Sequence, residues 1–316
     1  MRGLWLENQQ LALRHNLATP TPPHGEALIN IIRAGICNTD VELLRGYYPY
    51  AGVLGHEFVG VVESDGEWKG KRVVGEINAR CGKCEACLHK NRNHCEHRTV
   101  LGIQDRNGVF AEYTTLPYEN LHEVPHNVSE DEAVFTEPLA AALQILQQIQ
   151  IHPEDRVVLI GDGKLGLLCA QVVALSGCDL TVIGKHENKL EILKRRGIKT
   201  ALMKDAPKLK ADVAIEVTGS PSGFEMARSF LRGGGRLILK STYAGKLTLD
   251  ISSIVVDEIT IIGSRCGPFK AALDLLSRKL IDVGSFIHAR YKLDDAVTAM
   301  EKAQEAGVLK VLLDVS

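Results

Sequence analysis

The sequence of 316 residues predicts an α/β protein with a β-rich domain and a doubly wound, parallel-sheet domain. Three observations predict this class. Short apolar runs separated by glycine and proline fill about the first 135 residues. From residue 156 onward, apolar strands alternate with helical segments. A G-x-G-x-x-G sequence stands between the first strand and the first helix of that alternation. The length is typical of two domains rather than one.

The β-rich part begins with short strands such as residues 27–32 and 58–62, each bounded by turn-forming residues. One short helix is expected from Thr39 or Asp40 through Leu44, with the Thr39 hydroxyl as its cap. A stretch rich in helix-forming residues, 139–146, marks the change to the second part.

The second part is expected to form a parallel sheet covered on both faces, because its strands are apolar without alternation. The expected strands are residues 156–160, 180–183, 212–217, 236–239 and 259–262. Helices 164–175 and 187–196 each end at a glycine. The tail carries helical segments near 269–279 and 294–306 and a final strand, 309–313.

Charge and hydropathy exclude several classes of protein. The 37 basic and 39 acidic residues give a formal net charge of −2, whereas proteins that bind nucleic acid usually carry a basic excess. No apolar run reaches the roughly 18–20 residues that span a bilayer. The N-terminus has polar residues where a signal peptide would continue its apolar stretch, so we expect a cytoplasmic protein.

The glycine-rich turn indicates a dinucleotide site, because it follows a strand and opens a helix. Gly161 permits the tight turn, Gly163 lets a pyrophosphate approach the backbone, and Gly166 lets helix and strand pack closely. Lys164 and Leu165 begin the helix, whose free N–H groups can bind a phosphate. The alternative is a tight turn that binds no ligand.

The end of the second strand of the parallel sheet favours NADP over NAD. An acid usually stands there and holds the adenosine ribose hydroxyls. This chain has Gly184, followed by Lys185 and His186, and the first carboxylate, Glu187, comes three residues late. A missing acid beside a cation suits a 2′-phosphate, although Lys185 and His186 could also form a plain solvated loop.

Four cysteines predict a structural zinc site. Cys81, Cys84, Cys87 and Cys95 have the spacing C-x2-C-x2-C-x7-C, which can close a tetrahedral site within one loop. Iron–sulfur ligation uses the same first three positions, but its usual fourth spacing is x3 followed by proline. Free cysteines are the remaining alternative.

A catalytic zinc needs three protein ligands and one open position. The candidates are Cys37, His56 and Glu137, which are too far apart in sequence for spacing to unite them. Each also has a structural explanation: a small buried side chain, a turn histidine and an acid at a helix start.

Taken together, these motifs resemble the zinc-containing medium-chain dehydrogenase/reductase superfamily, the alcohol, sorbitol and threonine dehydrogenase group. The matching segments, in family order, are Gly35–Asp40, Gly55–Glu57, the four cysteines, Glu137–Pro138 and Gly161–Gly166. The resemblance implies a GroES-like β-rich catalytic domain at 1–137 with a zinc lobe at about 80–97. It also implies a Rossmann domain at 138–267 and a return to the catalytic domain at 268–316.

The resemblance implies two zinc ions per chain, with Cys37, His56 and Glu137 as ligands of the catalytic one. Glu57 would lie beside that metal, supporting its ligands or exchanging with one, and Thr39 would hydrogen-bond the substrate oxygen. The implied reaction moves a hydride between an alcohol and NAD(P), with a polyol, sugar derivative or secondary alcohol as substrate. A homo-oligomer, dimer or tetramer, is also implied.

Four further positions carry open expectations. Glu42 stands where some relatives have a proton-relay histidine, which leaves the proton route undefined. Ser264 and Arg265, after the last Rossmann strand, are expected near the nicotinamide or pyrophosphate. Lys310 either meets a phosphate or is a surface lysine.

Two rival functions remain. One is a zinc-independent quinone or enoyl reductase with the same fold, and the other is a non-catalytic dinucleotide-binding protein.

Overall fold

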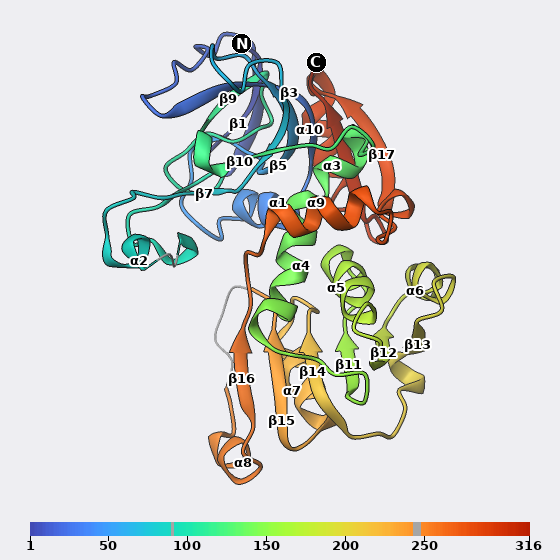
Figure 1. The fold of residues 1–316 in the computed structure, drawn as a ribbon. Helices are drawn as coiled ribbons and strands as arrows, with labels where there is room; N and C mark the ends of the chain where they lie inside the picture. Colours follow the sequence, from blue (N-terminus) through green and yellow to red (C-terminus); the bar gives the residue numbers. More distant parts are fainter. Residues whose placement is uncertain (90–91, 243–247) are drawn as a thin grey trace. The chain divides into compact units, whose positions relative to one another are not determined.

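The computed structural model describes residues 1–89, 92–242 and 248–316. It divides into two compact units, one of Met1–Glu137 with Phe269–Ser316 and one of Pro138–Pro268 (Figure 1). The α/β class expected from the sequence is confirmed, with a β-rich first unit and a parallel sheet in the second. Among the described residues, no helix has both the length and the apolarity that a membrane span requires.

The first unit is organised around a seven-stranded sheet of order β10-β6-β5-β3-β18-β17, in which β9 also pairs with β3. Its strands are β3 (Glu26–Gly35), β5 (Glu57–Val62), β6 (Arg72–Gly75), β9 (Tyr113–Pro117), β10 (Leu121–Glu123), β17 (Ile287–Lys292) and β18 (Lys310–Asp314). Two smaller sheets comprise β1 (Gly3–Glu7), β2 (Gln10–Arg14) and β4 (Gly52–Val53), and β7 (Asn78–Ala79) with β8 (Thr99–Val100).

The last strand of the chain lies in the middle of this sheet. β18 runs antiparallel to β3, so that Leu313 faces Ala34, and it runs parallel to β17. The C-terminal segment therefore completes the core of the first unit. The helices of this unit are α1 (Asn38–Leu44), α2 (Glu85–Leu88), α3 (Glu130–Val134), α9 (Phe269–Ser277) and α10 (Ala296–Lys302).

The start of α1 differs from the sequence prediction. Cys37, not Thr39, is the N-cap residue, and the Asp40 carboxylate accepts the backbone N–H of Cys37 at 2.8 Å. The expected Thr39 cap is therefore wrong. The reason is that an aspartate three residues into the helix reaches back to the cap residue and satisfies its N–H group.

The second unit is a six-stranded parallel sheet of order β13-β12-β11-β14-β15-β16 (Figure 1). Its strands are β11 (Arg156–Ile160), β12 (Asp179–Gly184), β13 (Lys199–Leu202), β14 (Ala211–Glu216), β15 (Leu231–Leu239) and β16 (Thr260–Gly263). Its helices are α4 (Thr136–Gln148), which begins two residues before the unit, α5 (Lys164–Ala174), α6 (Glu187–Lys194), α7 (Pro221–Phe230) and α8 (Ile251–Val256).

The strand order predicts a ligand site at the carboxyl ends of β11 and β14. The chain leaves β11 toward β12 and β13 and later returns to the other side of β11 with β14. In open parallel sheets, ligands bind at the carboxyl ends of the strands where the order reverses. The side chains of Val157–Ile160 are fully buried, which fixes β11 as the centre of this core.

Candidate active site and metal centres

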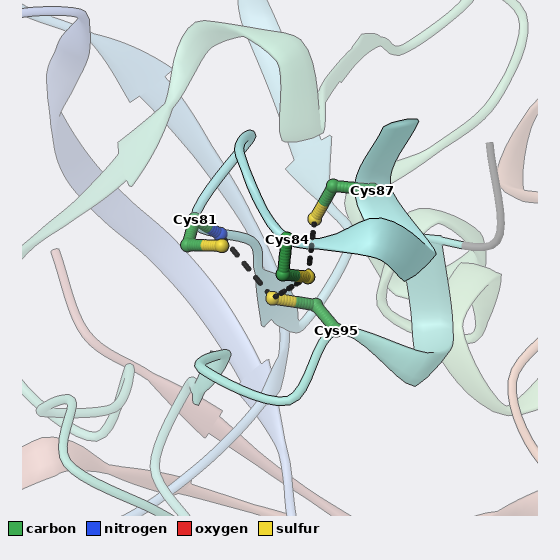
Figure 2. A group of neighbouring side chains, drawn as sticks. All are labelled: Cys81, Cys84, Cys87 and Cys95. Carbon is green, nitrogen blue, oxygen red and sulfur yellow. Dashed lines mark hydrogen bonds between the residues drawn. The ribbon is translucent and has the colours of Figure 1, made fainter. Parts of the chain in front are cut away.

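Four cysteine side chains converge in the lobe between β7 and β8 (Figure 2). Cys84 is the N-cap residue of α2 and Cys87 lies within that helix. The Cys84 sulfur is 3.5 Å from the Cys87 sulfur and 3.7 Å from the Cys95 sulfur. The Cys81 backbone N–H points to the Cys95 sulfur at 3.4 Å. All four sulfurs lie within 4.8 Å of one another, as a tetrahedral zinc site requires.

The chemistry of this set of donors fits zinc. Backbone N–H groups of Cys87 and Glu96 lower the pKa of Cys84 to about 6, which favours a thiolate. Burial, together with the hydrogen bond between Cys87 and Cys84, raises the pKa of Cys87 to about 12. A bound zinc would displace the protons that remain on the other thiols, since the thiolate is the ligand form. All eight cysteines lie within the described part of the chain and have free thiols.

A second cluster forms at the start of β5. Donor atoms of Cys37, His56 and Glu57 lie within 4.8 Å of one another. The antiparallel pairing of β3 and β5 sets Gly35 opposite Glu57, which brings residues distant in sequence together. His56 and Glu57 are almost fully buried, at 3% and 1% exposure. His56 Nδ1 and Asp40 Oδ1 are buried without a hydrogen-bond partner, which is costly, so this cluster favours a function over a purely structural role.

Asp40 orients the histidine of this cluster. Asp40 is fully buried, and its Oδ1 lies 3.3 Å from His56 Nδ1 without the alignment of a hydrogen bond. Burial lowers the pKa of His56, but Asp40 and Cys37 outweigh that effect and raise the pKa well above its ordinary value. Because Nδ1 faces the carboxylate, Nε2 is the ring nitrogen left for a metal.

Lys310 neutralises Glu57. The lysine is fully buried in β18, its ammonium contacts the Glu57 carboxylate, and it lies 3.4 Å from the Ile36 carbonyl. Burial lowers the pKa of Lys310, but the nearby charges of Glu57 and Cys37 raise it overall. The surface-lysine alternative is therefore wrong, and the phosphate contact of Lys310 stays a prediction.

Of the other residues expected at this site, Thr39 lies beside the cluster, whereas Glu137 and Glu42 are not part of its group of close donor atoms. Thr39 Oγ1 is 3.7 Å from the Cys37 sulfur, so the hydroxyl lies beside the donor atoms. Glu137 is in the first turn of α4, and the group of close donors among the described residues contains Glu57 instead. Glu42 pairs with Arg45 at 3.0 Å on α1, which does not define a proton route.

The glycine-rich turn has the geometry of a phosphate-binding turn. Gly161 has φ = 126°, and a Cβ there would lie 2.5 Å from the Val217 carbonyl oxygen. A Cβ on Gly166 would lie 2.2 Å from the Gly161 carbonyl oxygen, which explains the close packing of α5. A Cβ on Gly163 would meet nothing within 4 Å, so this backbone faces open space. Gly163 is the N-cap residue of α5, and Lys164 and Leu165 open the helix.

The sequence analysis missed Asp162, which lies inside this turn and is 7% exposed. Its carboxylate accepts the backbone N–H groups of Lys185 (2.8 Å) and His186 (2.6 Å) at the end of β12. An acid in the first variable position of G-x-G-x-x-G is a signal that sequence reasoning could have used. Its partners, more than twenty residues away, only become evident once β11 and β12 pair.

Ser264 and Arg265 follow β16 and are held by a buried cation. The Lys240 ammonium contacts Ser264 Oγ at 3.3 Å, the Arg265 carbonyl at 3.2 Å and the Ala141 carbonyl at 2.6 Å. Lys240 follows β15, so the segment after β16 is fixed at the carboxyl ends of the strands. This is the edge of the sheet at which the strand order predicts the ligand site.

Known proteins resemble the chain over both units. Residues 23–126 match the family model of the alcohol dehydrogenase GroES-like domain, and residues 165–278 match that of the zinc-binding dehydrogenase. A sorbitol dehydrogenase from Halalkalibacterium halodurans is 30% identical in an alignment that covers 93% of this chain and 93% of the relative.

Solved structures extend the likeness. A protein from Sinorhizobium meliloti 1021, bound to NADP, has a TM-score of 0.91 and 27% identity, covering 99% of each chain. A short chain alcohol dehydrogenase from Escherichia coli CFT073, complexed with NADH, has a TM-score of 0.90 and 27% identity. The alignment with the latter covers 100% of this chain and 99% of the other.

Proposed function

The chain belongs to the zinc-binding alcohol dehydrogenase family, and on that premise we propose how its residues divide the work of the reaction. The enzyme is an oxidoreductase that moves a hydride between an alcohol carbon and NAD(P). The observation that carries the proposal is the buried cluster of Cys37, His56 and Glu57 with Asp40 behind the histidine. We assign the catalytic zinc to this cluster and the structural zinc to the four cysteines.

Glu137 is proposed as the third protein ligand, and Glu57 as the group beside the metal. The ion pair with Lys310 supports this division, because it neutralises the Glu57 carboxylate. A neutralised carboxylate suits a group that supports the metal ligands or exchanges with one of them. Zinc, when bound, supplies Lewis-acid polarisation of the substrate oxygen and lowers the pKa of the hydroxyl.

The residues around the zinc position the substrate and its proton. Thr39 Oγ1, close to the Cys37 sulfur, accepts the hydroxyl proton and passes it on. Asp40 holds His56 in one orientation, and Lys310 keeps the net negative charge around Glu57 low. Glu42 remains our candidate for the outer end of the proton route.

The dinucleotide is proposed to bind at the carboxyl ends of β11 and β14. Gly161, Gly163 and Gly166 let the pyrophosphate approach the backbone, and the N–H groups of Lys164 and Leu165 bind it. Ser264 and Arg265 would contact the nicotinamide half, and Lys310 a phosphate. Lys185 and His186 favour NADP over NAD.

The substrate is proposed to be a polyol, a sugar derivative or a secondary alcohol. The acidic third ligand and the likeness to a sorbitol dehydrogenase support this class. The working form is proposed to be a cytoplasmic homo-oligomer. The free cysteines suit a reducing compartment, and exposed apolar side chains on α8 and the edge strand β16 suit a subunit interface.

An alcohol panel tests the proposed function. Purified enzyme is assayed with polyols, sugar alcohols and secondary alcohols, with NAD and NADP in parallel, by absorbance at 340 nm, and its zinc is measured. We expect two zinc ions per chain and turnover of at least one alcohol, faster with NADP. Reduction of a quinone or enoyl substrate by zinc-free enzyme would favour the zinc-independent reductase. Bound zinc and dinucleotide without any turnover would favour the non-catalytic protein.

A further inference from the structure

The glycine motif assigns no role in dinucleotide binding to Asp162, yet this residue is buried within the turn that the motif forms. We propose that Asp162 determines the dinucleotide preference: it holds the turn between β12 and α6 so that Lys185 and His186 bind a 2′-phosphate. This inference rests on the proposed function, because it refines the nucleotide site of that enzyme.

The Asp162 carboxylate accepts hydrogen bonds from the protein backbone. A carboxylate at the end of the second strand usually accepts ribose hydroxyls. The Asp162 carboxylate comes from the preceding turn and accepts protein donors instead. Its Oδ2 takes the N–H groups of Lys185 at 2.8 Å and His186 at 2.6 Å, which fixes the backbone of that turn. Hydrogen bonds to a charged acceptor are strong, so this turn is held firmly.

The Asp162 side chain also fills the space that a side chain at position 184 would need. A Cβ on Gly184 would lie 2.6 Å from Asp162 Oδ2 and 2.7 Å from its Cβ. Real Cβ atoms do not approach other atoms so closely, so no acid fits at position 184 while Asp162 is present. The absence of the strand-end acid and the presence of Asp162 are therefore one feature.

Asp162 also orients the imidazole ring of His186. Its Nδ1 lies 3.1 Å from Asp162 Oδ2 and 3.2 Å from Oδ1, so Nδ1–H donates to the carboxylate. The ring nitrogen left for a ligand is Nε2, on a side chain that is 45% exposed. In the imidazolium form of this ring, Nδ1–H stays on the Asp162 carboxylate and Nε2–H points away from it, toward a ligand.

The local charge suits a phosphate. Lys185 is exposed beside His186, and Asp162 is already bound by three protein donors. The next carboxylate along the chain, Glu187, faces Lys194 at 3.9 Å. The Lys185 ammonium and the His186 ring thus remain at the ribose end of the site, where a 2′-phosphate carries its charge.

The test measures binding of 2′,5′-ADP, 5′-AMP, NADP and NAD to the whole enzyme by calorimetry. His186→Ala should weaken 2′,5′-ADP about tenfold, the loss expected for one hydrogen bond to a charged group, with 5′-AMP within about twofold. Asp162→Asn should act in the same direction. Its neutral amide would hold the two backbone N–H groups and the His186 ring less tightly than the carboxylate does.

The double variant Asp162→Asn/His186→Ala should lose less affinity for 2′,5′-ADP than the sum of the two single losses, because part of the effect of Asp162 passes through the His186 ring. Glu187→Gln is the matched control, since it also removes one negative charge near the turn. It should leave 2′,5′-ADP unchanged or bound more tightly.

Several results would overturn the inference. One is that Asp162→Asn binds 2′,5′-ADP more tightly and 5′-AMP more weakly. Another is that Asp162→Asn changes the affinity for neither ligand. The third is that the losses of affinity in the double variant are additive. The first result would mean that Asp162 itself binds the ribose and repels the phosphate.

A swap of the two positions gives an independent readout. Gly184→Asp alone should lower the melting temperature, because the new Cβ meets Asp162. Gly184→Asp with Asp162→Ala should restore the melting temperature and shift preference toward NAD. A single Gly184→Asp variant with wild-type stability would contradict the steric argument. These measurements do not need turnover, so an enzyme that binds dinucleotides but oxidises no alcohol would fail the proposed function and not this inference.

Discussion

Single residues at the proposed catalytic zinc are organised by Asp40. Its Oδ2 accepts the Cys37 N–H at 2.8 Å, and its Oδ1 lies 3.3 Å from His56 Nδ1. One buried carboxylate thus holds the backbone of one proposed ligand and the ring of another. Carboxylates behind a ligating histidine fix its orientation and raise its basicity, so the contribution of Asp40 is to metal affinity.

Removal of the Asp40 charge tests this contribution. Asp40→Asn should bind zinc about 10–100-fold more weakly at the catalytic site, since that range is typical of lost partners behind a ligand. Competition with a chelator measures the affinity, and binding of NADP, measured in parallel, should not change. Asp65→Asn is the control, because Asp65 is 91% exposed and pairs only with Lys69. Equal zinc retention in Asp40→Asn and Asp65→Asn would contradict the role given to Asp40.

At the scale of elements, ion pairs fasten the C-terminal segment to the first part of the chain. Arg33 of β3 contacts Asp131 of α3 and Asp314 of β18, both at 2.6 Å. Arg290 of β17 also contacts Asp131. These pairs lie where β18 pairs with β3, so they lock the register that also buries Lys310 against Glu57.

Asp131→Asn should destabilise the protein at neutral pH by about 1 kcal/mol, a modest value because the pairs are partly solvated. Burial raises the pKa of Asp131, but Arg290 and Arg33 outweigh it and the net pKa is lowered. A lowered folded-state pKa stabilises the fold above the unfolded pKa, about 3.9, and that stabilisation is lost as the pH falls through the folded value.

Urea unfolding from pH 7 down to the acid limit of folding measures this difference. The wild type and Asp131→Asn should converge as the pH falls, whereas Asp65→Asn should differ little from the wild type throughout. A difference between the wild type and Asp131→Asn that is constant with pH would mean that the Asp131 charge does not contribute.

For the whole molecule, the sequence predicts elements best where the pattern is strong and local. The apolar strand 156–160 and the helix that follows the glycine turn appear as expected, within a residue or two. The strands β13 and β17 were not expected, because their residues are only partly buried or alternate with polar ones. Their place in the sheet comes from tertiary pairing, which overrides weak local preference.

The candidate sites follow the same rule. The four cysteines share one loop, so their spacing alone predicted the cluster in Figure 2. The Cys37, His56 and Glu57 cluster needs β3 and β5 to pair, and the contact of Lys310 with Glu57 needs a strand from the far end of the chain. Spacing carries no information on such long-range contacts, which is why the pairing of Lys310 with Glu57 and the contacts of Asp162 were not predicted.

The most direct test of the account compares one variant at each proposed zinc, Cys37→Ser and Cys95→Ser, with the wild type. For each protein, zinc content, melting temperature, NADP affinity and kcat/KM for the best alcohol are measured. Cys37→Ser should lose one zinc and about a thousandfold or more of kcat/KM, while its melting temperature and NADP affinity stay near wild type. Cys95→Ser should lose the other zinc and several degrees of melting temperature, with turnover retained in the folded fraction. Wild-type turnover in Cys37→Ser would contradict a catalytic zinc at Cys37 and His56.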